Sequence, residues 1–277
     1  MPREFHDLAE RQLNHESGGA TAWGNFGDWQ TAQTYPAACT ALADQLGTRL
    51  ALSARSRVMD VGFGCGDQLL HWVRHYGVRQ LAGLNLSSSQ TDFARQRLAD
   101  AGHPDIAAAL TVGSARDLVP QATAGGQARP DTVIALDCAY HFESRTRFLT
   151  DAANVLAPGG QLGVTDLVLA QDTRRWRHAA ALMLMTRSAR IPRANLVTAD
   201  TYRAQWRQAG FAEPAFVDIS EQVMLPFGNW LRRYKQSLAP ALRARINWRK
   251  YDATAAFMRW ACRERVLRYV VCVGQKR

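Results

Sequence analysis

The chain has 277 residues, 47% of them hydrophobic, and its five cysteines form no C-x-x-C pair, which excludes a disulfide-rich scaffold and fits reduced thiols. No apolar run approaches the roughly 20 residues that span a bilayer, and the charged N-terminus lacks the apolar centre of a signal peptide, so we expect a cytoplasmic protein. The formal net charge of +10 comes from residues 171–277, where 21 Lys and Arg face 7 Asp and Glu, and this leaves nucleic acid, an anionic membrane and an acidic substrate open as partners.

Residues 1–50 are expected to form an N-terminal lid and one helix. The stretch from Trp23 to Trp29 mixes aromatic residues with glycine outside any periodic pattern, which is unusual in a plain linker. These aromatics either hold the N-terminus against the core or cover a ligand, and under the second interpretation Trp23 and Trp29 bind substrate. The stretch from Tyr35 to Leu50 then repeats apolar residues with a helical period and predicts a helix that packs on a sheet.

A short apolar run, Val58 to Val61, predicts a buried strand, and three glycines follow it at every second position, namely Gly62, Gly64 and Gly66. Glycines are needed where the backbone turns sharply or a ligand lies against it. The helix predicted over residues 68–76 directs unpaired N–H groups at this turn. The spacing differs from the G-x-G-x-x-G of dinucleotide folds, and Asp60 at the strand end would repel a pyrophosphate. The turn is therefore expected to hold a cofactor with a cationic group.

The D-x-G-x-G-x-G pattern of residues 60–66 resembles motif I of the class I S-adenosylmethionine-dependent methyltransferases, whose cofactor carries an amine and a sulfonium. The resemblance implies that Asp60 and the three glycines hold the amino-acid end of the cofactor. A second strand is predicted over residues 79–86 and a helix over residues 90–101. The resemblance implies that Asn85, with Leu86 and Gln90 beside it, binds the ribose, where an acidic residue is commoner in the family.

A third strand is predicted over residues 106–112 and a fourth from Asp131 onward. In the family the positions of Ser114 and Ala115 border the adenine, and Asp137 would line the methionine side. All of these polar residues follow strands, and open parallel sheets bind ligands at the carboxyl ends of their strands. We therefore expect them to converge on one crevice.

The run V-L-A-P-G-G-Q-L, residues 155–162, closely resembles the family signature before the fifth strand, which is predicted over residues 161–166. Four elements thus agree in order over residues 55–170. They imply an α/β fold, a doubly wound and mostly parallel seven-stranded sheet of the Rossmann-like methyltransferase type. A helical N-terminal lid and C-terminal helical cap insertions are expected around it.

We expect one catalytic domain, with an S-adenosylmethionine-binding core over residues 51–170, a substrate cap over 171–263 and the last sheet strand within 264–277. The cap includes a sixth strand near residues 215–219. Its Met and aromatic side chains are more often core than pocket. The acceptor must nevertheless be covered, and the cap is the only large region outside the family pattern, so Met183 is expected to bind substrate.

The resemblance implies a methyltransferase that uses S-adenosylmethionine, releases S-adenosylhomocysteine and requires no metal. The acceptor is expected to be a small organic molecule, whether anionic, lipid-like or a natural-product intermediate. The basic cap favours an anionic or amphipathic acceptor, although a solvated basic face explains the same charge equally well. Peripheral membrane contact and the oligomeric state stay open.

Two alternatives remain at this point. The basic half is compatible with nucleic-acid methylation, but the fourth strand does not end in the Asn/Asp-Pro-Pro-Tyr/Phe motif of exocyclic amine methyltransferases, and no RNA-binding module is recognisable. A cofactor-binding regulator without activity is compatible with Asn85 and Ser114, which stand where acids are commoner.

His141 and Tyr140 are the candidate catalytic residues, because they lie just past the fourth strand, where the crevice should place them beside the methyl donor. Histidine is the side chain best suited to accept a proton near neutral pH. Tyr140 could orient an acceptor or line the sulfonium with its ring. The competing interpretation is that both residues pack beneath the lid.

Overall fold

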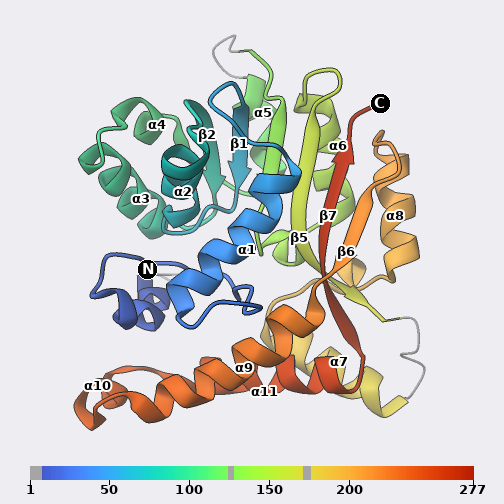
Figure 1. Ribbon diagram of the computed structural model, residues 1–277. Helices are drawn as coiled ribbons and strands as arrows, with labels where there is room; N and C mark the ends of the chain where they lie inside the picture. The colour runs from blue at the N-terminus through green and yellow to red at the C-terminus, as the bar shows by residue number, and fades with distance from the viewer. Residues whose placement is uncertain (1–7, 124–127, 171–175) are drawn as a thin grey trace.

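The protein is described by a computed structural model over residues 8–123, 128–170 and 176–277 (Figure 1). Its seven-stranded sheet has the strand order β3-β2-β1-β4-β5-β7-β6. Strands β1 to β5 pair in parallel, whereas β7 runs antiparallel to both β5 and β6. The doubly wound, mostly parallel seven-stranded sheet expected from the sequence is confirmed.

The strands are β1 (Arg57–Val61), β2 (Gln80–Asn85), β3 (Leu110–Val112), β4 (Thr132–Ala135), β5 (Gln161–Leu169), β6 (Ala215–Asp218) and β7 (Leu267–Gln275). The α-helices are α1 (Tyr35–Arg49), α2 (Asp67–Tyr76), α3 (Ser88–Asp100), α4 (Pro104–Ala108), α5 (Leu118–Thr123), α6 (Arg145–Val155), α7 (Trp176–Ser188), α8 (Ala199–Gln208), α9 (Ser220–Ser237), α10 (Pro240–Arg245) and α11 (Trp248–Arg263). Short 3-10 helices are η1 (Leu8–Ser17), η2 (Ala115–Asp117), η4 (Ala139–His141) and η5 (Arg193–Asn195).

The prediction of a strand from residue 106 is wrong at its start. Pro104 occupies the first position of helix α4, which suits its fixed φ and its missing N–H, and the strand β3 begins only at Leu110.

Side chains alternate across the sheet, so the strands contribute to two separate hydrophobic cores. In β1, Val58 packs in one core and Met59 in the other, as the two-residue period of a strand requires. The first core lies under α1 and α2 and includes Leu42 and Trp72, whereas the second lies under α6 and α8 and includes Trp206.

Helices α9, α10 and α11 form a helical layer beneath the carboxyl ends of the parallel strands in the view of Figure 1. They are inserted between β6 and β7, while α7 and α8 are inserted between β5 and β6. The N-terminal segment contacts this layer, because Tyr234 of α9 donates a hydrogen bond to the carbonyl of Gln12 and the Trp29 amide donates to the carbonyl of Gln222. Across the described ranges, no helix combines the length and the apolar character that crossing a bilayer requires.

A buried ion pair fixes α6 to β5. Arg145 is 1% exposed, and its Nη1 lies 3.0 Å from Oδ2 of Asp166, which is fully buried. The hydroxyl of Tyr202 in α8 donates to the same carboxylate at 2.7 Å, and the guanidinium carbon lies 3.8 Å from the centre of the Tyr202 ring. The ion pair therefore holds α6, β5 and α8 together in the second core.

We expect Asp166→Leu to lower the free energy of unfolding by about 3–5 kcal/mol, because it leaves the Arg145 guanidinium charged and buried without its carboxylate. The double variant Arg145→Met, Asp166→Leu should recover part of this loss, since neither charge then remains buried. Urea denaturation of the two single variants and the double variant measures the effect. Strictly additive losses would contradict the interpretation.

Candidate active site

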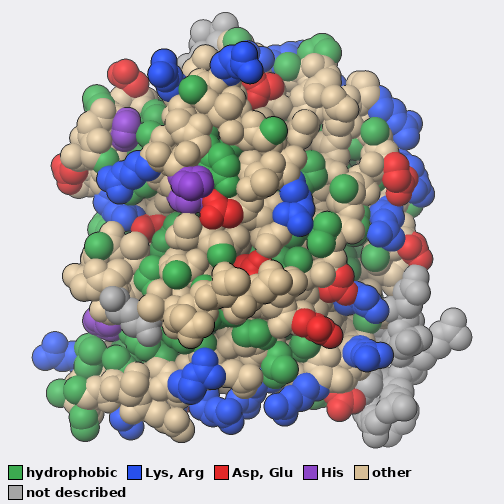
Figure 2. Space-filling model, in the orientation of Figure 1, with side chains coloured by type: hydrophobic (Ala, Val, Ile, Leu, Met, Phe, Trp, Pro, Cys, Tyr) green, Lys and Arg blue, Asp and Glu red, His purple; other side chains and the backbone are tan. Residues whose placement is uncertain are grey.

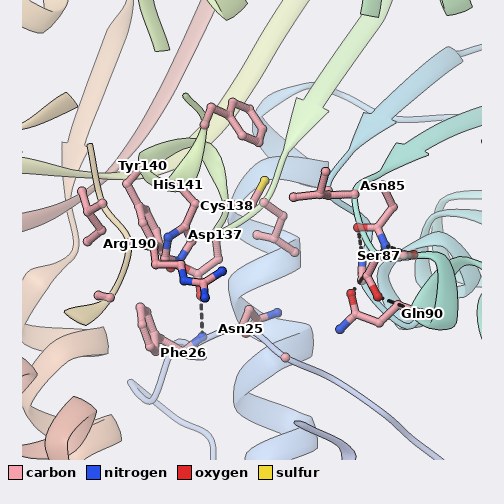
Figure 3. A pocket seen from close by; sticks show the side chains of 18 of the residues that line it. Asn25, Phe26, Asn85, Ser87, Gln90, Asp137, Cys138, Tyr140, His141 and Arg190 are labelled. Carbon is pink, nitrogen blue, oxygen red and sulfur yellow. Dashed lines mark hydrogen bonds between the residues drawn. The ribbon is translucent and has the colours of Figure 1, made fainter. Parts of the chain in front are cut away.

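One large cavity opens at the carboxyl ends of β1, β2 and β4 (Figure 3). Its volume is about 1180 Å³. The N-terminal segment, the turn after β1, the ends of β2 and β4, the exit of α7 and the start of α11 all contribute to its walls. The crevice expected at the strand ends is therefore present, and it extends into the cap.

The three glycines of the turn after β1 all have positive φ, and the absence of a side chain serves two different purposes there. A Cβ on Gly62 would lie 2.6 Å from Sγ of Cys138, and a Cβ on Gly66 would lie 2.8 Å from Cβ of Ala94 in α3. A Cβ on Gly64 would meet no protein atom within 4 Å, and Gly64 lines the cavity. Two glycines thus permit close packing, and the third keeps space open to a ligand.

Asp60 lies beneath this turn and outside the cavity lining. Its carboxylate is fully buried and accepts hydrogen bonds from Nε1 of Trp72 at 2.7 Å and Nε2 of Gln68 at 2.8 Å. Burial raises the pKa of Asp60 to about 6, although these two hydrogen bonds oppose the shift. In this arrangement the carboxylate binds α2 rather than facing the cavity.

Asp67, which the sequence analysis did not single out, lines the cavity instead. Its Oδ1 and Oδ2 lie 2.9 and 2.5 Å from the two terminal nitrogens of Arg97, and the amide of Ala22 donates to Oδ2 at 3.0 Å. The signal in the sequence was an acid placed directly after the third glycine, at the start of a helix. Asp67 therefore joins the turn, α3 and the N-terminal segment.

At the end of β2, Asn85, Leu86 and Gln90 all line the cavity. The amide oxygen of Asn85 accepts from the Gly64 amide at 3.3 Å, and its Nδ2 donates to the carbonyl of Ser87 at 3.3 Å. Leu86 leaves 73% of its surface exposed, so its side chain is open to the cavity. The structure thus brings these three predicted residues together beside the glycine turn.

Ser114 and Ala115 line the neighbouring part of the cavity, after β3. The Ser114 hydroxyl accepts from the amide of Arg116, and Asp117 accepts from the Ser114 amide at 2.8 Å, a reciprocal cap of η2. Their backbone is held in place by this cap.

Asp137 follows β4 and has a left-handed φ of 56°, a strained conformation for a residue with a side chain. Its Oδ1 accepts from the hydroxyls of Tyr140 at 2.9 Å and Tyr269 at 2.6 Å, and its Oδ2 accepts from the amide of Phe26 at 2.8 Å. Burial raises the pKa of Asp137 to about 7, although the hydrogen bonds to its ionised form oppose the shift. The carboxylate thus joins β4, β7 and the N-terminal segment.

Tyr140 and His141 lie in η4, and both line the cavity, with ring centroids 4.4 Å apart (Figure 3). Burial raises the pKa of Tyr140 well above its usual value, and its hydroxyl is bound to Asp137. Tyr140 therefore contributes a ring rather than a proton acceptor, which leaves His141 as the base candidate of this pair.

Asn195 of η5 holds this segment from behind and was missed in the sequence, where no motif marks it. Its Nδ2 donates to the carbonyls of Tyr140 at 3.2 Å and Phe142 at 2.6 Å, one on each side of His141. Its Oδ1 accepts from the amide of Arg145 at 3.1 Å. Because Asn195 is only 2% exposed, the backbone around His141 is fixed from the protein interior.

The residues expected to contact substrate divide into two groups. Trp23 lines the cavity, as does Tyr140. Trp29 does not; it stacks on Trp230 at 5.2 Å and fastens the N-terminal segment to α9. Met183 is 47% exposed and is likewise outside the lining, where Met185, half a helical turn further on, takes part. The structure therefore does not bring Trp29 and Met183 to the cavity.

Comparison with known proteins supplies the family. Residues 32–213 match the model of a family described as a methyltransferase domain. The chain is 30% identical over 226 residues to erythromycin 3''-O-methyltransferase of Saccharopolyspora erythraea, covering 79% of this chain and 72% of that one. It is 26% identical over 258 residues to 27-O-demethylrifamycin SV methyltransferase of Amycolatopsis mediterranei, covering 92% and 91%.

The fold also matches a solved structure, the geranyl diphosphate C-methyltransferase of Streptomyces coelicolor A3(2) in complex with Mg²⁺, geranyl-S-thiolodiphosphate and S-adenosyl-L-homocysteine. The TM-score is 0.70 at 14% identity, with 98% of this chain and 93% of that one covered. A family match over more than half of the chain agrees with the strand order and with the glycine turn beside the cavity. The chain therefore belongs to the class I S-adenosylmethionine-dependent methyltransferases.

Proposed function

We propose that the protein transfers a methyl group from S-adenosylmethionine to a hydroxyl oxygen of a small, largely apolar acceptor of the natural-product type. The observation that carries the proposal is the continuity of one cavity from the glycine turn, past His141, to an apolar wall in the cap. The names of the two curated relatives, both methyltransferases of natural products, support an oxygen acceptor over nucleic acid.

The residues around the glycine turn fit the cofactor. The space above Gly64 admits a ligand against the backbone, and the start of α2 directs its amide groups toward the same place. Asn85 and Gln90 offer polar groups to a ribose, and the exposed Leu86 offers an apolar surface to a purine, with Ser114 and Ala115 at its edge. When bound, S-adenosylmethionine supplies a methyl group on a sulfonium whose sulfur leaves as a thioether.

His141 is proposed to hold the acceptor hydroxyl and to remove its proton as the new C–O bond forms. A hydroxyl is a weak nucleophile until its proton is accepted, and general-base catalysis contributes roughly 10²–10⁴-fold. The ring of Tyr140 restricts His141 from one side, and Asn195 fixes the backbone on both sides of it. Alignment of the acceptor oxygen with the methyl group provides the rest.

Asp137 is proposed to close the N-terminal lid. Its carboxylate accepts the Phe26 amide, and the Phe26 ring lies 5.0 Å from Phe227 of α9 and 6.2 Å from Tyr269. The lid therefore rests on β4, β7 and the helical layer at once, and Asp137 is one of its polar contacts.

Gly64→Ala should weaken the binding of S-adenosylhomocysteine by at least roughly 10-fold, because its Cβ enters the space reserved for the cofactor. Gly77→Ala is the matched control, because Gly77 also has positive φ, at 71°, and a Cβ there meets only Ala54 at 3.8 Å, away from the cavity. Both variants should lose about 1–2 kcal/mol of stability to backbone strain. Titration calorimetry measures the binding, and equal affinity in both variants would place the cofactor elsewhere.

His141→Ala should lower turnover roughly 10²–10⁴-fold and leave S-adenosylhomocysteine affinity unchanged. Mass spectrometry of hydroxylated macrolide, polyketide and phenolic acceptors, incubated with enzyme and isotope-labelled S-adenosylmethionine, identifies an acceptor first. The pH–rate profiles of wild type and variant are then compared, with His103→Ala, outside the cavity, as the control.

An acidic limb and a rate that both survive in His141→Ala would make this histidine structural. Transfer to none of the hydroxylated acceptors, with transfer to amines or thiols instead, would contradict the proposed oxygen chemistry.

Asp137→Asn should change how stability depends on pH. The folded-state pKa of about 7 lies above that of an unfolded aspartate, so the contribution of Asp137 to stability is fully present below about pH 4 and is lost as the pH rises toward 7. Relative to Asp137→Asn, the wild type should lose unfolding free energy across this window, at up to about 1.4 kcal/mol per pH unit. Denaturant titrations at several pH values measure the free energy of unfolding, with Asp92→Asn at an exposed position as the control. If the free energies of wild type and Asp137→Asn change in parallel with pH, the raised pKa of Asp137 is disproved.

A further inference from the structure

Helix α7 presents apolar side chains on both its inner and its outer side. The inner side contributes Leu182 to the first core and Met185 to the wall of the cavity. The outer side of a helix at the surface of a globular protein is ordinarily polar. In α7 the exposed positions from residue 179 to residue 184 are instead all apolar, and they form the α7 patch: Ala179, Ala180, Met183 and Leu184.

Two side chains of the α7 patch are large. Met183 is 47% exposed and Leu184 is 70% exposed, and over the described residues only Leu86 and Val112 are comparable. Leu86 is open to the cavity, and Val112 ends β3 at the opposite edge of the sheet from β6. Single exposed apolar side chains are common, whereas adjoining ones on a helix side without a polar residue mark a contact surface.

Arginines adjoin the α7 patch, and no acid accompanies them. Residues 176–199 include four arginines and no Asp or Glu. Arg187 is exposed and lies one helical turn after Met183, on the same side of α7. Arg193 is also exposed, and its Nη2 lies 3.2 Å from Sδ of Met183. The patch therefore suits a partner that is apolar and negatively charged at once.

The same sign of charge continues over the helical layer of α9, α10 and α11. Residues 220–265 include ten Lys and Arg but three Asp and Glu, and seven of the ten basic residues are exposed. Lys and Arg side chains gather along the lower edge of the molecule in Figure 2, where Figure 1 places both α7 and the helical layer. The basic surface is thus broader than one helix.

Charge decides between the possible occupants of the α7 patch. A second copy of the chain would bring the same arginines together in a symmetric contact, and residues 176–199 offer them no acid. A partner that binds α7 alone would leave the basic surface of the helical layer unmatched. An anionic bilayer matches both features, because it accepts apolar side chains among its headgroups and attracts Lys and Arg over a wide area.

We propose that the protein binds the surface of anionic lipid bilayers through α7, with Met183 and Leu184 inserted among the headgroups and Arg187 and Arg193 bound to lipid phosphates. The segment after α7 lines the cavity with Ile191, so this contact brings the acceptor side of the cavity to the bilayer. The inference goes beyond the proposed function and does not depend on it.

The test is flotation of the full chain with vesicles of phosphatidylglycerol or of phosphatidylcholine. At low salt the wild type should bind the anionic vesicles at least roughly 10-fold more tightly than the zwitterionic ones. Leu184→Ser should weaken binding to the anionic vesicles roughly 10-fold, because an apolar side chain is lost from the contact. Arg187→Gln, Arg193→Gln should weaken it by a similar factor of roughly 10, because two phosphate contacts are lost.

Each variant has a matched control. Val112→Ser removes an exposed large apolar side chain outside both α7 and the cavity lining. Arg55→Gln, Arg79→Gln removes two charges from exposed positions just before β1 and β2, at the ends of these strands away from the cavity. Both controls should bind the vesicles as the wild type does, and thermal unfolding checks that all variants are folded.

Three results would overturn the proposal. The first is equal flotation of the wild type with both kinds of vesicle, or with neither. The second is wild-type binding by Leu184→Ser, or a loss no larger than that of Val112→Ser. The third is a wild-type dimer in light scattering that Leu184→Ser dissociates, since a second copy would then cover the α7 patch. S-adenosylhomocysteine calorimetry tests the proposed function separately, because its failure would leave vesicle binding intact.

Discussion

The hydrogen bonds that the Asp60 carboxylate accepts from Trp72 and Gln68 are the contacts on which the rest of the site depends. They join the end of β1 to α2 across the glycine turn. The glycine turn is therefore fixed at both ends, while its middle residue, Gly64, stays uncovered. Fully burying a carboxylate is costly, as the raised pKa of Asp60 indicates, and two strong donors offset part of that cost. The two hydrogen bonds keep the backbone of the glycine turn in one conformation beside the cavity.

A second acid repeats this arrangement one strand away, with a different outcome. Asp137 also ends a strand and accepts several hydrogen bonds, but one of its donors is the amide of Phe26 in the N-terminal segment. Burial raises the pKa of both carboxyl groups, that of Asp137 to about 7 and that of Asp60 to about 6. The two carboxylates thus differ in what they hold: Asp60 binds α2 beside the glycine turn, and Asp137 binds the N-terminal segment.

The mostly parallel seven-stranded sheet, the glycine turn and a crevice at the strand ends could be predicted, because each depends on local pattern and on chain connectivity. The direction of individual side chains could not. From the sequence, Trp23 and Trp29 were equally good candidates for binding substrate. The Trp29 indole, however, donates to the Phe26 carbonyl and stacks on a helix nearly 200 residues away in the chain. Phe26 lines the cavity in its place. The role of Asn195 could not be predicted for the same reason, since it depends on three backbone groups some 50 residues earlier in the chain.

The division of the cavity follows from the topology. The cofactor side is built from turns that directly follow the parallel strands. The backbone geometry of these turns limits which side chains can stand in them. The wall of the cavity opposite the cofactor side comes from two separate insertions, one between β5 and β6 that carries Ile191 and one between β6 and β7 that carries Phe257. Because β5 and β6 both run antiparallel to β7, they end at the same edge of the sheet, and both insertions begin on the side of the cavity. Either insertion can therefore change the wall that faces the acceptor without disturbing the cofactor turn.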